Sequence, residues 1–439
     1  MVGAGLIVAA PATGSGKTVV TLGLLRALVD RGIAVASAKV GPDYIDPAFL
    51  SAASGGPCPN LDGWAMRPAT LAARIAALGQ AELIVCEGVM GLFDGAAALP
   101  GEPSGSTAEL AALTGWPVIL VVDAARQAGS AAALVRGFVT HRADIHVAGV
   151  IFNRVNGTSH RATIEEACKT ALPDLPILGW LPRDPALALP ERHLGLIQAR
   201  ETAGLESRIA HAARVVAEHV DIPALIRLAR SSKLVAADAG PPLPPLGQRI
   251  AIARDDAFAF IYGETLEGWR SSGAELSFFS PLADEAPAPG ADAVYLPGGY
   301  PELHAARLAA AKNFLSGLHA RADAGAVILG ECGGAMTLGE SLEDGDGVTH
   351  AMAGLLPLAT SFKKRKLHLG YRRCILARDT PLGKAGDSFR AHEFHYATET
   401  TAAGPSLFQV ADARGQSLGE TGQVSGRVMG SFMHLIDRA

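Results

Sequence analysis

Residues 9–18 read Ala-Ala-Pro-Ala-Thr-Gly-Ser-Gly-Lys-Thr, and this stretch decides the fold of the first half of the chain. It follows a short apolar run at residues 6–8 and precedes a helical pattern over residues 19–31. A strand, a glycine-rich turn and a helix form the context of a phosphate-binding loop, where backbone N–H groups face phosphate oxygens. The alternative is a glycine-rich turn with a lysine at the helix start. We favour the nucleotide site.

Four residues of this stretch have expected roles in binding ATP. Gly14 and Gly16 free the backbone to wrap a phosphate, Lys17 is expected to reach the β- and γ-phosphates, and the Thr18 hydroxyl is expected to hold Mg²⁺. Pro11 stands where the strict pattern G-x-x-x-x-G-K-[ST] has its first glycine. The loop is therefore a degenerate form of that pattern.

Size and composition narrow the class of protein. The 439 residues are ample for two or three domains, and 49% of them are hydrophobic. The net charge of -5 argues against a general binder of nucleic acid or membrane surfaces. The five cysteines are scattered without C-x-x-C spacing, which favours reduced thiols in a cytosol. No apolar run approaches the ~20 residues that span a bilayer. We expect a cytoplasmic protein with no nucleic-acid or membrane partner.

Residues 1–235 alternate between strand and helix patterns. Most of the expected strands are continuous apolar runs, as in a parallel sheet buried on both faces; they cover residues 6–10, 35–40, 83–87, 118–123, 147–153 and 177–181. Helical patterns occupy residues 69–78, 107–113, 130–141, 159–171 and 205–230. The order predicts a doubly wound α/β domain that binds its ligands at the carboxyl ends of the strands.

A proline-rich stretch, residues 236–247, predicts the domain boundary. Its four prolines and two glycines exclude regular structure and indicate a stiff, extended spacer. Residues 248–439 then start a second α/β pattern, with strands expected at residues 250–253, 275–279, 293–296 and 326–329. The expected fold class is α/β: a parallel-sheet phosphate-loop domain followed by a second α/β domain.

Charged residues follow the second expected strand. Asp43 is a candidate Mg²⁺ ligand, Lys39 is a candidate for neutralising phosphate charge, and Asp46 is a candidate contact for metal or substrate. Each lies where a doubly wound sheet places its ligands. A solvated Asx turn is the equal alternative for the two aspartates.

Three further polar residues lie at expected strand ends or in the loops after them. Glu87 ends the third apolar strand, where a nucleotide site keeps its second metal carboxylate. Asp94, between glycines, is a candidate for positioning the acceptor, and loop capping is its alternative. Asn153 is a candidate partner for an adenine edge, and a strand-end turn is its alternative.

The second domain contains a G-x-C-x-G sequence between an expected strand and an expected helix. Cys332, framed by Gly330 and Gly334, has the arrangement of a nucleophile elbow with cysteine in place of serine. Such a turn is expected to expose the sulfur at a helix N-terminus, where the thiolate is favoured. The alternative is a small buried apolar side chain.

A paired-glycine turn and several histidines supply the other parts of a cysteine-based site. The N–H groups of Gly299 and Gly333 are expected to form an oxyanion hole. Three histidines compete for the role of base: His434 near the C-terminus, and His392 and His395. The basic run at residues 363–366 is either a solvated turn or an approach for an acidic substrate.

Together these motifs resemble the cobyrinic acid a,c-diamide synthase family, which includes hydrogenobyrinic acid a,c-diamide synthases. The resemblance covers essentially the whole chain and is carried by residues 10–18, 39–47, 87–95, 296–302, 330–334, 392–396 and 434. The family joins a dethiobiotin-synthetase-like ATP domain to a triad-type glutamine amidotransferase domain. Its phosphate loop departs from the strict pattern in the same way as this one.

The resemblance implies amidation of the a- and c-acetate side chains of a corrin ring, hydrogenobyrinic or cobyrinic acid, in cobalamin biosynthesis. ATP with Mg²⁺ activates each carboxylate as an acyl phosphate, and ammonia from L-glutamine displaces the phosphate. By position, four residues match the ATP and Mg²⁺ group: Lys17, Thr18, Asp43 and Glu87. Asp46 and Asp94 match residues near the reacting carboxylate.

The resemblance also implies roles in the glutaminase half. Cys332 matches the nucleophile, and His434 matches the histidine that raises its nucleophilicity. Many related glutaminases have a glutamate two residues after that histidine, where this chain has Ile436. Asp437 is not at the usual spacing, and Glu393 is a further candidate for the third triad member.

Three other functions are alternatives to this one. Cobyric acid synthase amidates other side chains of the same ring, but its sequence after the second strand differs from residues 41–47 here. A partition-type ATPase switch would bind DNA or membrane, but it has a signature lysine at the position of Pro11 and needs no Cys332 elbow. A glutamine-binding scaffold with a dead site would not hydrolyse glutamine. The expected partners are a corrin polycarboxylate, L-glutamine and ATP, with a homodimer as one candidate assembly.

Overall fold

The computed structural model describes residues 4–192, 195–196, 198–235 and 237–439, which fold as two compact units. The first unit comprises residues 1–64, 68–96 and 103–238, and the second comprises residues 65–67, 97–102 and 239–439. The main division thus falls inside the proline-rich stretch at residues 236–247. The two short segments that group with the second unit have no counterpart in the division expected from the sequence.

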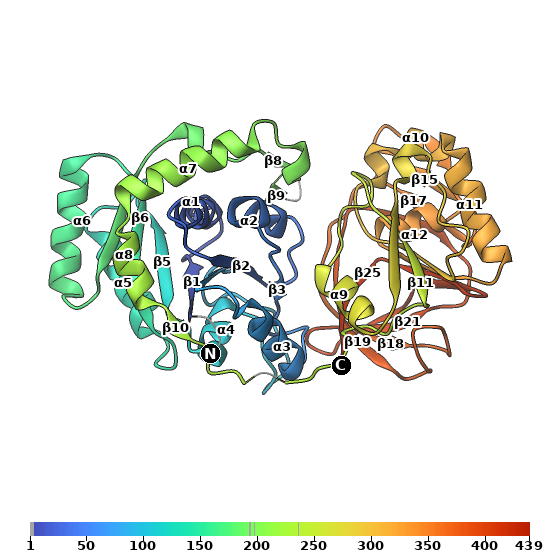
Figure 1. Cartoon of the computed structure of the whole chain (residues 1–439), viewed down its shortest axis with the longest axis horizontal. Coiled ribbons are helices and arrows are strands. Elements are labelled where there is room, and N and C mark those ends of the chain that lie inside the picture. Colours follow the sequence, from blue (N-terminus) through green and yellow to red (C-terminus); the bar gives the residue numbers. More distant parts are fainter. Residues whose placement is uncertain (1–3, 193–194, 197, 236) are drawn as a thin grey trace. The chain divides into compact units, whose positions relative to one another are not determined.

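The first unit is built on a mainly parallel sheet with the strand order β3-β2-β4-β1-β5-β6-β7 (Figure 1). The strands are β1 (Ala4–Ala9), β2 (Val35–Val40), β3 (Asn60–Leu61), β4 (Leu83–Glu87), β5 (Val118–Asp123), β6 (Val147–Val155) and β7 (Ile177–Pro182). A short strand, β10 (Arg230–Ser231), pairs antiparallel with β1. A two-stranded ribbon, β8 (Glu191–Arg192) with β9 (Gly195–Leu196), completes the strands.

The helices between these strands cover the sheet. They are α1 (Lys17–Val29), α2 (Asp46–Ser54), α3 (Pro68–Leu78), α4 (Thr107–Thr114), α5 (Ser130–Thr140), α6 (Thr158–Ala171), α7 (Leu205–His219) and α8 (Ile222–Leu228). The helix expected over residues 205–230 is two helices. The break lies at Asp221, whose side chain caps α8 by accepting the N–H of Ala224. Helix α2 was not expected, because the sequence there reads as a turn.

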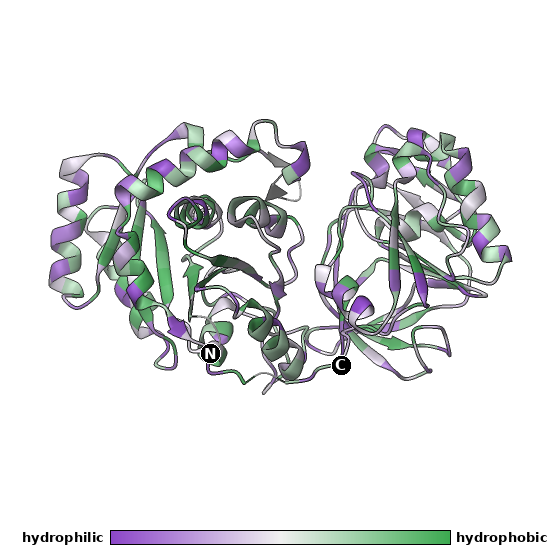
Figure 2. Cartoon of the chain, in the orientation of Figure 1, coloured by the Kyte–Doolittle hydropathy of each residue, from purple (hydrophilic) through white to green (hydrophobic). Residues whose placement is uncertain are grey.

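Burial explains the sheet of the first unit. Residues 6–10 of the β1 region and residues 118–122 of β5 are at most 1% exposed, as expected for strands covered on both faces. Figure 2 shows apolar colour along β5 and mixed colour along α6. Strand β1 lies between β4 and β5, with Val8 paired to Glu87 and Ala9 to Leu120. The phosphate loop after β1 therefore begins beside the end of β4.

The second unit contains a six-stranded sheet with the order β12-β11-β13-β14-β24-β23. Its strands are β11 (Arg249–Ala253), β12 (Glu275–Phe279), β13 (Ala293–Leu296), β14 (Val327–Glu331), β23 (Gln423–Ser425) and β24 (Val428–Ser431). All pairs are parallel except β23 with β24. The helices are α9 (Gly263–Ser271), α10 (Ala305–Ala310), α11 (Lys312–Asp323) and α12 (Gly333–Leu338). The α/β fold class expected for both domains is confirmed.

Two further sheets in the second unit were not expected from the sequence. One is antiparallel, with the order β22-β21-β18-β19-β25, and it contains β18 (His368–Leu376), β19 (Ser388–His395), β21 (Phe408–Asp412), β22 (Ser417–Thr421) and β25 (Met433–Arg438). The other has the order β16-β15-β17-β20, with β15 (Ser341–Glu343), β16 (Thr349–Ala351), β17 (Leu358–Ser361) and β20 (Thr398–Ala402). Most of their strands are partly exposed, and they lack the continuous apolar runs that marked the parallel strands.

The proline-rich stretch is not a free spacer over its whole length. Leu243 and Leu246 are buried in the core of the second unit. The indole N–H of Trp269 donates to the carbonyl oxygen of Pro244 at 3.1 Å. The stretch lacks regular structure, as expected, but the part after Gly240 packs on the second unit. Among the described residues, no helix has the length and apolar character needed to cross a bilayer.

Candidate active sites

The phosphate loop borders a cavity of about 1150 Å³ in the first unit. Gly16 has φ of 90°, in the left-handed region that favours glycine, and a Cβ there would overlap the side-chain amide of Asn153. The sequence-predicted residues that line this cavity are Gly14, Gly16, Lys17, Thr18, Lys39, Asp43, Asp46, Glu87 and Asn153. The cavity lies at the carboxyl ends of the strands, where a doubly wound sheet binds ligands.

Lys17 is 8% exposed and points across the loop, where its Nζ donates to the carbonyl oxygen of Met90 at 2.8 Å. Burial lowers the pKa of Lys17, and the nearby charge of Glu87 opposes that shift. A phosphate oxygen offers this ammonium group a stronger, charge-assisted partner than a neutral carbonyl does.

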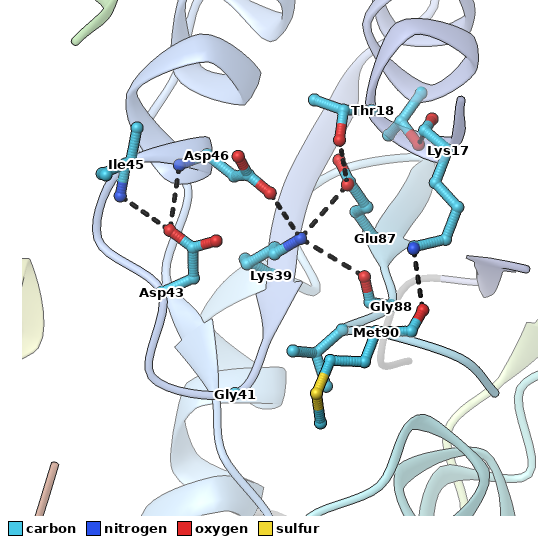
Figure 3. Close-up of polar contacts among 12 residues, drawn as sticks. Lys17, Thr18, Lys39, Gly41, Asp43, Ile45, Asp46, Glu87, Gly88 and Met90 are labelled. Atoms are coloured by element: carbon cyan, nitrogen blue, oxygen red, sulfur yellow. Dashed lines mark hydrogen bonds and ion pairs between the residues drawn. The ribbon is translucent and has the colours of Figure 1, made fainter. Parts of the chain in front are cut away.

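Behind the loop, buried charges of both signs bind one another (Figure 3). Lys39 Nζ lies 2.7 Å from Asp46 Oδ2 and 3.1 Å from Glu87 Oε1, and it also donates to the carbonyl oxygen of Gly88 at 3.3 Å. The Thr18 hydroxyl donates to the same Glu87 oxygen at 2.7 Å. Although desolvation opposes it, the surrounding carboxylates raise the pKa of Lys39, so this lysine is a fixed cation. One ammonium group therefore holds together a carboxylate from the end of β4 and one from the start of α2.

The donor set fits a Mg²⁺ site. Glu87 Oε2 is buried and has no hydrogen-bond partner within the described residues, although Oε1 has two. Asp43 uses Oδ1 to accept the N–H groups of Ile45 and Asp46, at 2.8 and 3.1 Å, so the Asx turn that was weighed as an alternative exists. Burial raises the pKa of Asp43 to about 7. Hard oxygen donors beside a phosphate cavity suit Mg²⁺.

Asp94 and Asn153 both brace loops. Asp94 Oδ2 accepts the N–H of Gly91 at 2.9 Å, which is the loop-capping role weighed as its alternative. The Asn153 amide donates to the carbonyl oxygen of Ser15 at 3.0 Å, and its oxygen accepts the N–H of Arg154 at 2.9 Å. Asn153 lines the cavity but directs these two bonds to the protein and not to a ligand.

In the second unit, Cys332 lies at the turn between β14 and α12 with φ of 49° and ψ of −108°. A positive φ at a non-glycine residue indicates local strain, which is typical of a nucleophile elbow. A Cβ at Gly330 would come within 2.7 Å of the Ala335 backbone nitrogen, and one at Gly334 would overlap the Leu296 carbonyl oxygen. The glycines on both sides of the cysteine are therefore sterically required.

The sulfur is less accessible than the sequence led us to expect. Cys332 is 3% exposed, and its Sγ lies 4.0 Å from the carbonyl oxygen of Phe394. Burial raises the pKa of the thiol, which the Gly333 N–H lowers only in part. The expected exposed thiolate is wrong for this structure, because desolvation outweighs the helix N-terminus.

Among the three candidate bases, His434 lies beside the elbow. A Cβ built on Gly298 would overlap His434 Cε1 and would lie 3.3 Å from Cys332 Cβ, so Gly298 separates the two side chains. Burial, together with the charges of His392 and His395, lowers the pKa of His434 to about 3. The imidazole is therefore neutral at pH 7, the state that accepts a proton.

The other histidines have different surroundings. His392 pairs with His434 across β19 and β25, and burial lowers its pKa to about 4. His395 Nε2 lies 2.9 Å from Glu393 Oε1, Nδ1 contacts the carbonyl oxygen of Ala397, and the ring stacks on Phe432. His395 is thus held within its own cluster.

Both candidates for the third triad member bind basic side chains. Glu393 binds Arg372 at 2.6 Å as well as His395. The Asp437 carboxylate binds the Arg67 guanidinium at 2.8 Å, and Arg67 belongs to a short segment of the second unit. Both carboxylates therefore have partners other than His434, and the sequence, which left the third triad member open, had assigned the role to neither.

Glu331, the last residue of β14, was not among the residues expected at the site. Its Oε1 accepts the N–H of Leu435, the residue after His434, at 3.2 Å, and its Oε2 accepts the Tyr295 hydroxyl at 2.7 Å. Burial raises the pKa of Glu331 to about 7. This carboxyl group ties the strand before Cys332 to the edge strand that carries His434. A charged residue that ends a buried strand was the available signal.

The two units match two family models. Residues 6–197 match the CobQ/CobB/MinD/ParA nucleotide-binding domain. Residues 249–438 match the CobB/CobQ-like glutamine amidotransferase domain. The phosphate loop lies in the first match, and the Cys332 elbow with His434 lies in the second.

Curated relatives match almost the whole chain. A protein of Brucella anthropi named hydrogenobyrinate a,c-diamide synthase is 54% identical over 438 residues, which are 99% of this chain and 98% of the relative. Proteins of the same name from Brucella suis and Rhizobium meliloti are 55% and 54% identical, over 99% of this chain and 98% and 99% of their own lengths. The chain therefore belongs to the hydrogenobyrinate a,c-diamide synthase family, which joins a nucleotide-binding domain to a glutamine amidotransferase domain and forms amides with nitrogen from glutamine.

Proposed function

We propose that this enzyme converts the a- and c-acetate carboxylates of a corrin ring, in hydrogenobyrinic or cobyrinic acid, into amides, with ATP and L-glutamine as co-substrates. The observation that carries the proposal is full-length similarity above 50% to proteins named for this reaction. The alternative of a partition-type switch leaves the Cys332 elbow without a function. Residues 41–47, Gly-Pro-Asp-Tyr-Ile-Asp-Pro, favour this branch over cobyric acid synthases.

In the first unit, a ring carboxylate oxygen attacks the γ-phosphorus of ATP, and ADP leaves. The loop from Gly14 to Thr18 binds the phosphates, and Lys17 exchanges its bond to the Met90 carbonyl for one to a phosphate oxygen. Mg²⁺, which Thr18, Asp43 and Glu87 would hold, supplies charge neutralisation when bound. Ammonia then attacks the acyl carbon and inorganic phosphate leaves, because phosphate is a far better leaving group than hydroxide.

In the second unit, the Cys332 sulfur attacks the side-chain amide carbon of glutamine, and His434 accepts the thiol proton. The N–H groups of Gly299 and Gly333 stabilise the oxyanion. His434 then protonates the leaving nitrogen, ammonia departs, and water hydrolyses the thioester to glutamate. The neutral state of His434 and the steric need for glycine at positions 298 and 334 support this assignment.

The proposal also covers the cellular compartment and the oligomeric state of the enzyme. We place the enzyme in the cytoplasm, because its chemistry consumes ATP and its cysteines are free in the structure. A homodimer is the proposed assembly, and light scattering of the purified protein tests it.

Product mass tests the proposed reaction. Purified enzyme is incubated with ATP, Mg²⁺ and glutamine, and with hydrogenobyrinic or cobyrinic acid in parallel. The expected product carries two amides, and fragmentation places them on the a- and c-acetates. A product amidated on other side chains identifies cobyric acid synthase activity, and ATP hydrolysis without any corrin product contradicts both.

A further inference from the structure

The loop after β13 carries a glutamate that the mechanism above does not use. Pro301 opens a short 3₁₀ helix, η4 (Pro301–Leu303), which packs against α12 directly after the Cys332 elbow. The approach is tight, because a Cβ on Gly333 would come within 2.7 Å of Pro301 Cδ and within 3.2 Å of the Gly299 nitrogen. Glu302 follows Pro301. Its backbone is thus fixed beside the nucleophile and the expected oxyanion hole.

Glu302 has an unusual polar environment. Its Oε2 is buried and has no hydrogen-bond partner within the described residues. Burial raises the pKa of Glu302 to about 7, and a hydrogen bond from its own backbone N–H and the charge of Arg365 oppose the shift. Leaving a buried carboxylate oxygen without a partner is costly, and such groups in native proteins call for an explanation.

The neighbouring carboxylates differ from Glu302 in this respect. Glu331 accepts bonds from the Tyr295 hydroxyl and the Leu435 N–H, and Glu393 binds Arg372 and His395. The charge of Glu302 nevertheless acts on the Cys332 thiol more strongly than that of Glu331 or Glu393. A carboxyl group with one buried, unpartnered oxygen therefore lies within electrostatic reach of the reacting sulfur.

We propose that Glu302 binds the α-ammonium group of L-glutamine and so selects an α-amino acid amide as the nitrogen donor. The inference rests on the proposed glutaminase role of the second unit. Glutamine carries its ammonium group a short carbon chain away from the amide that Cys332 attacks. A carboxylate beside the nucleophile can therefore bind one end of the substrate while the sulfur reaches the other. Hydrogen bonds between charged groups are among the stronger polar contacts in proteins.

Binding of the ammonium group has a second consequence. The negative charge of Glu302 disfavours ionisation of the Cys332 thiol in the free enzyme. An ammonium group paired with that carboxylate cancels the repulsion. Glutamine binding thereby makes it easier for His434 to take the thiol proton, and the cysteine is activated when its proper substrate is present.

The test compares L-glutamine with glutaramate, the same amide without the α-amino group, in the full-length enzyme and in Glu302→Gln. Glutaramate is measured as a substrate or, if turnover is slow, as a competitive inhibitor of glutamine hydrolysis. For the wild type, we expect kcat/KM for glutamine to exceed the glutaramate value clearly. In Glu302→Gln, the glutamine value falls by about 10-fold to 100-fold, while glutaramate binding changes less than about threefold.

Two outcomes would overturn the inference. One is an equal loss for both compounds, which identifies a purely structural role for Glu302. The other is an unchanged preference for glutamine in the variant. Glu420→Gln, which removes a carboxylate from an exposed position on edge strand β22, is the matched control and is expected to keep the wild-type preference.

The failure of the proposed function has a different signature. A wild type that hydrolyses no glutamine, yet amidates the corrin with ammonium, contradicts the glutaminase assignment itself. Ammonium-dependent amidation by Glu302→Gln at the wild-type rate shows that its synthetase unit is intact, and retained glutaramate binding shows that its glutaminase unit is folded.

Discussion

The phosphate-loop site and the cysteine site hold buried titratable groups in different ways. In the first, Lys39 stays charged because Asp46 and Glu87 surround it, so buried charges of opposite sign satisfy one another. In the second, desolvation keeps Cys332 and His434 in their neutral forms. In the proposed mechanism, the first site binds the charged phosphates of ATP, and the second transfers a proton between two neutral groups. Variants that separate the two halves of the reaction sharpen this difference.

The largest effect is expected for Cys332→Ala. Glutamine hydrolysis should fall by at least about 10³-fold, because no other residue replaces the nucleophile. Amidation supported by ammonium should persist, since the synthetase unit has its own substrates. Glutamate release and corrin product are measured in parallel. Cys168→Ala, a buried cysteine in α6, is the control and should leave both activities unchanged. Equal loss of both activities would show that the centres are not separable.

Lys17→Ala should have the reverse pattern. Removing the loop lysine takes away a charge that stabilises the transferring phosphoryl group, so amidation should fall by roughly 10²-fold to 10³-fold with either nitrogen source. Basal glutamine hydrolysis should stay near the wild-type rate. Product formation is assayed at saturating ATP, with the exposed Lys169→Ala as control. Full rescue of the variant by ammonium would contradict a role for Lys17 in ATP chemistry.

Gly298→Ala tests the geometry of the cysteine site without removing a functional group. The added methyl group would overlap His434 Cε1, so one of the two side chains must move. Because a displacement of about 1 Å can cost roughly 10²-fold in rate, glutamine hydrolysis should fall by about that factor. Ammonium-dependent amidation reports on the other unit. Gly263→Ala is the control, since a Cβ there meets open space. Full activity of Gly298→Ala would contradict the proposed role of His434 in glutamine hydrolysis.

The first unit could be predicted well from the sequence. Its strands are continuous apolar runs, and the expected ranges at residues 35–40, 83–87 and 118–123 agree with the observed strands. Parallel strands end at one edge, so residues at those ends, such as Lys39 and Glu87, had to lie close together. The sequence pattern did not predict the hydrogen-bond partners of these residues. Asp94 and Asn153 bind backbone groups, because loops must satisfy their own polar atoms.

The cysteine site was less predictable. The Cys332 elbow is formed by residues that are neighbours in the sequence, and its flanking glycines make it recognisable there. His434, in contrast, comes from an antiparallel sheet whose strands carry no continuous apolar run, and its position depends on long-range pairing of β25 with β19. The burial of Cys332 depends on the loop at residues 298–302 and on Phe394, which lie far from it in the chain. Sequence patterns do not show which distant segments cover a side chain. The expectation of an exposed Cys332 sulfur was therefore wrong.

The smallest effect concerns Glu331, and it is a pH dependence of stability. The pKa of this carboxyl group is about 7 in the folded protein, against the usual 4.5. Between pH 4.5 and pH 7, the folded state therefore holds a proton that the unfolded state has lost, and stability falls as the pH rises. Above pH 7 both states are ionised, and the cost stays constant at about 3 kcal/mol, from 1.36 kcal/mol per pKa unit. The buried charge of Glu331 thus destabilises the contact between β14 and β25 at high pH.

Glu331→Gln should remove this cost, because the amide can accept the Leu435 N–H and donate to the Tyr295 hydroxyl. We expect the variant and the wild type to have about the same free energy of unfolding at pH 5. At pH 8, the variant should be more stable by up to about 3 kcal/mol. Hydrogen exchange of peptides from β14 and β25, compared at each pH, measures the difference because intrinsic exchange rates cancel within each pair. Glu420→Gln, at an exposed position, should show no such trend. A constant offset across the pH range would mean that Glu331 does not titrate in this window.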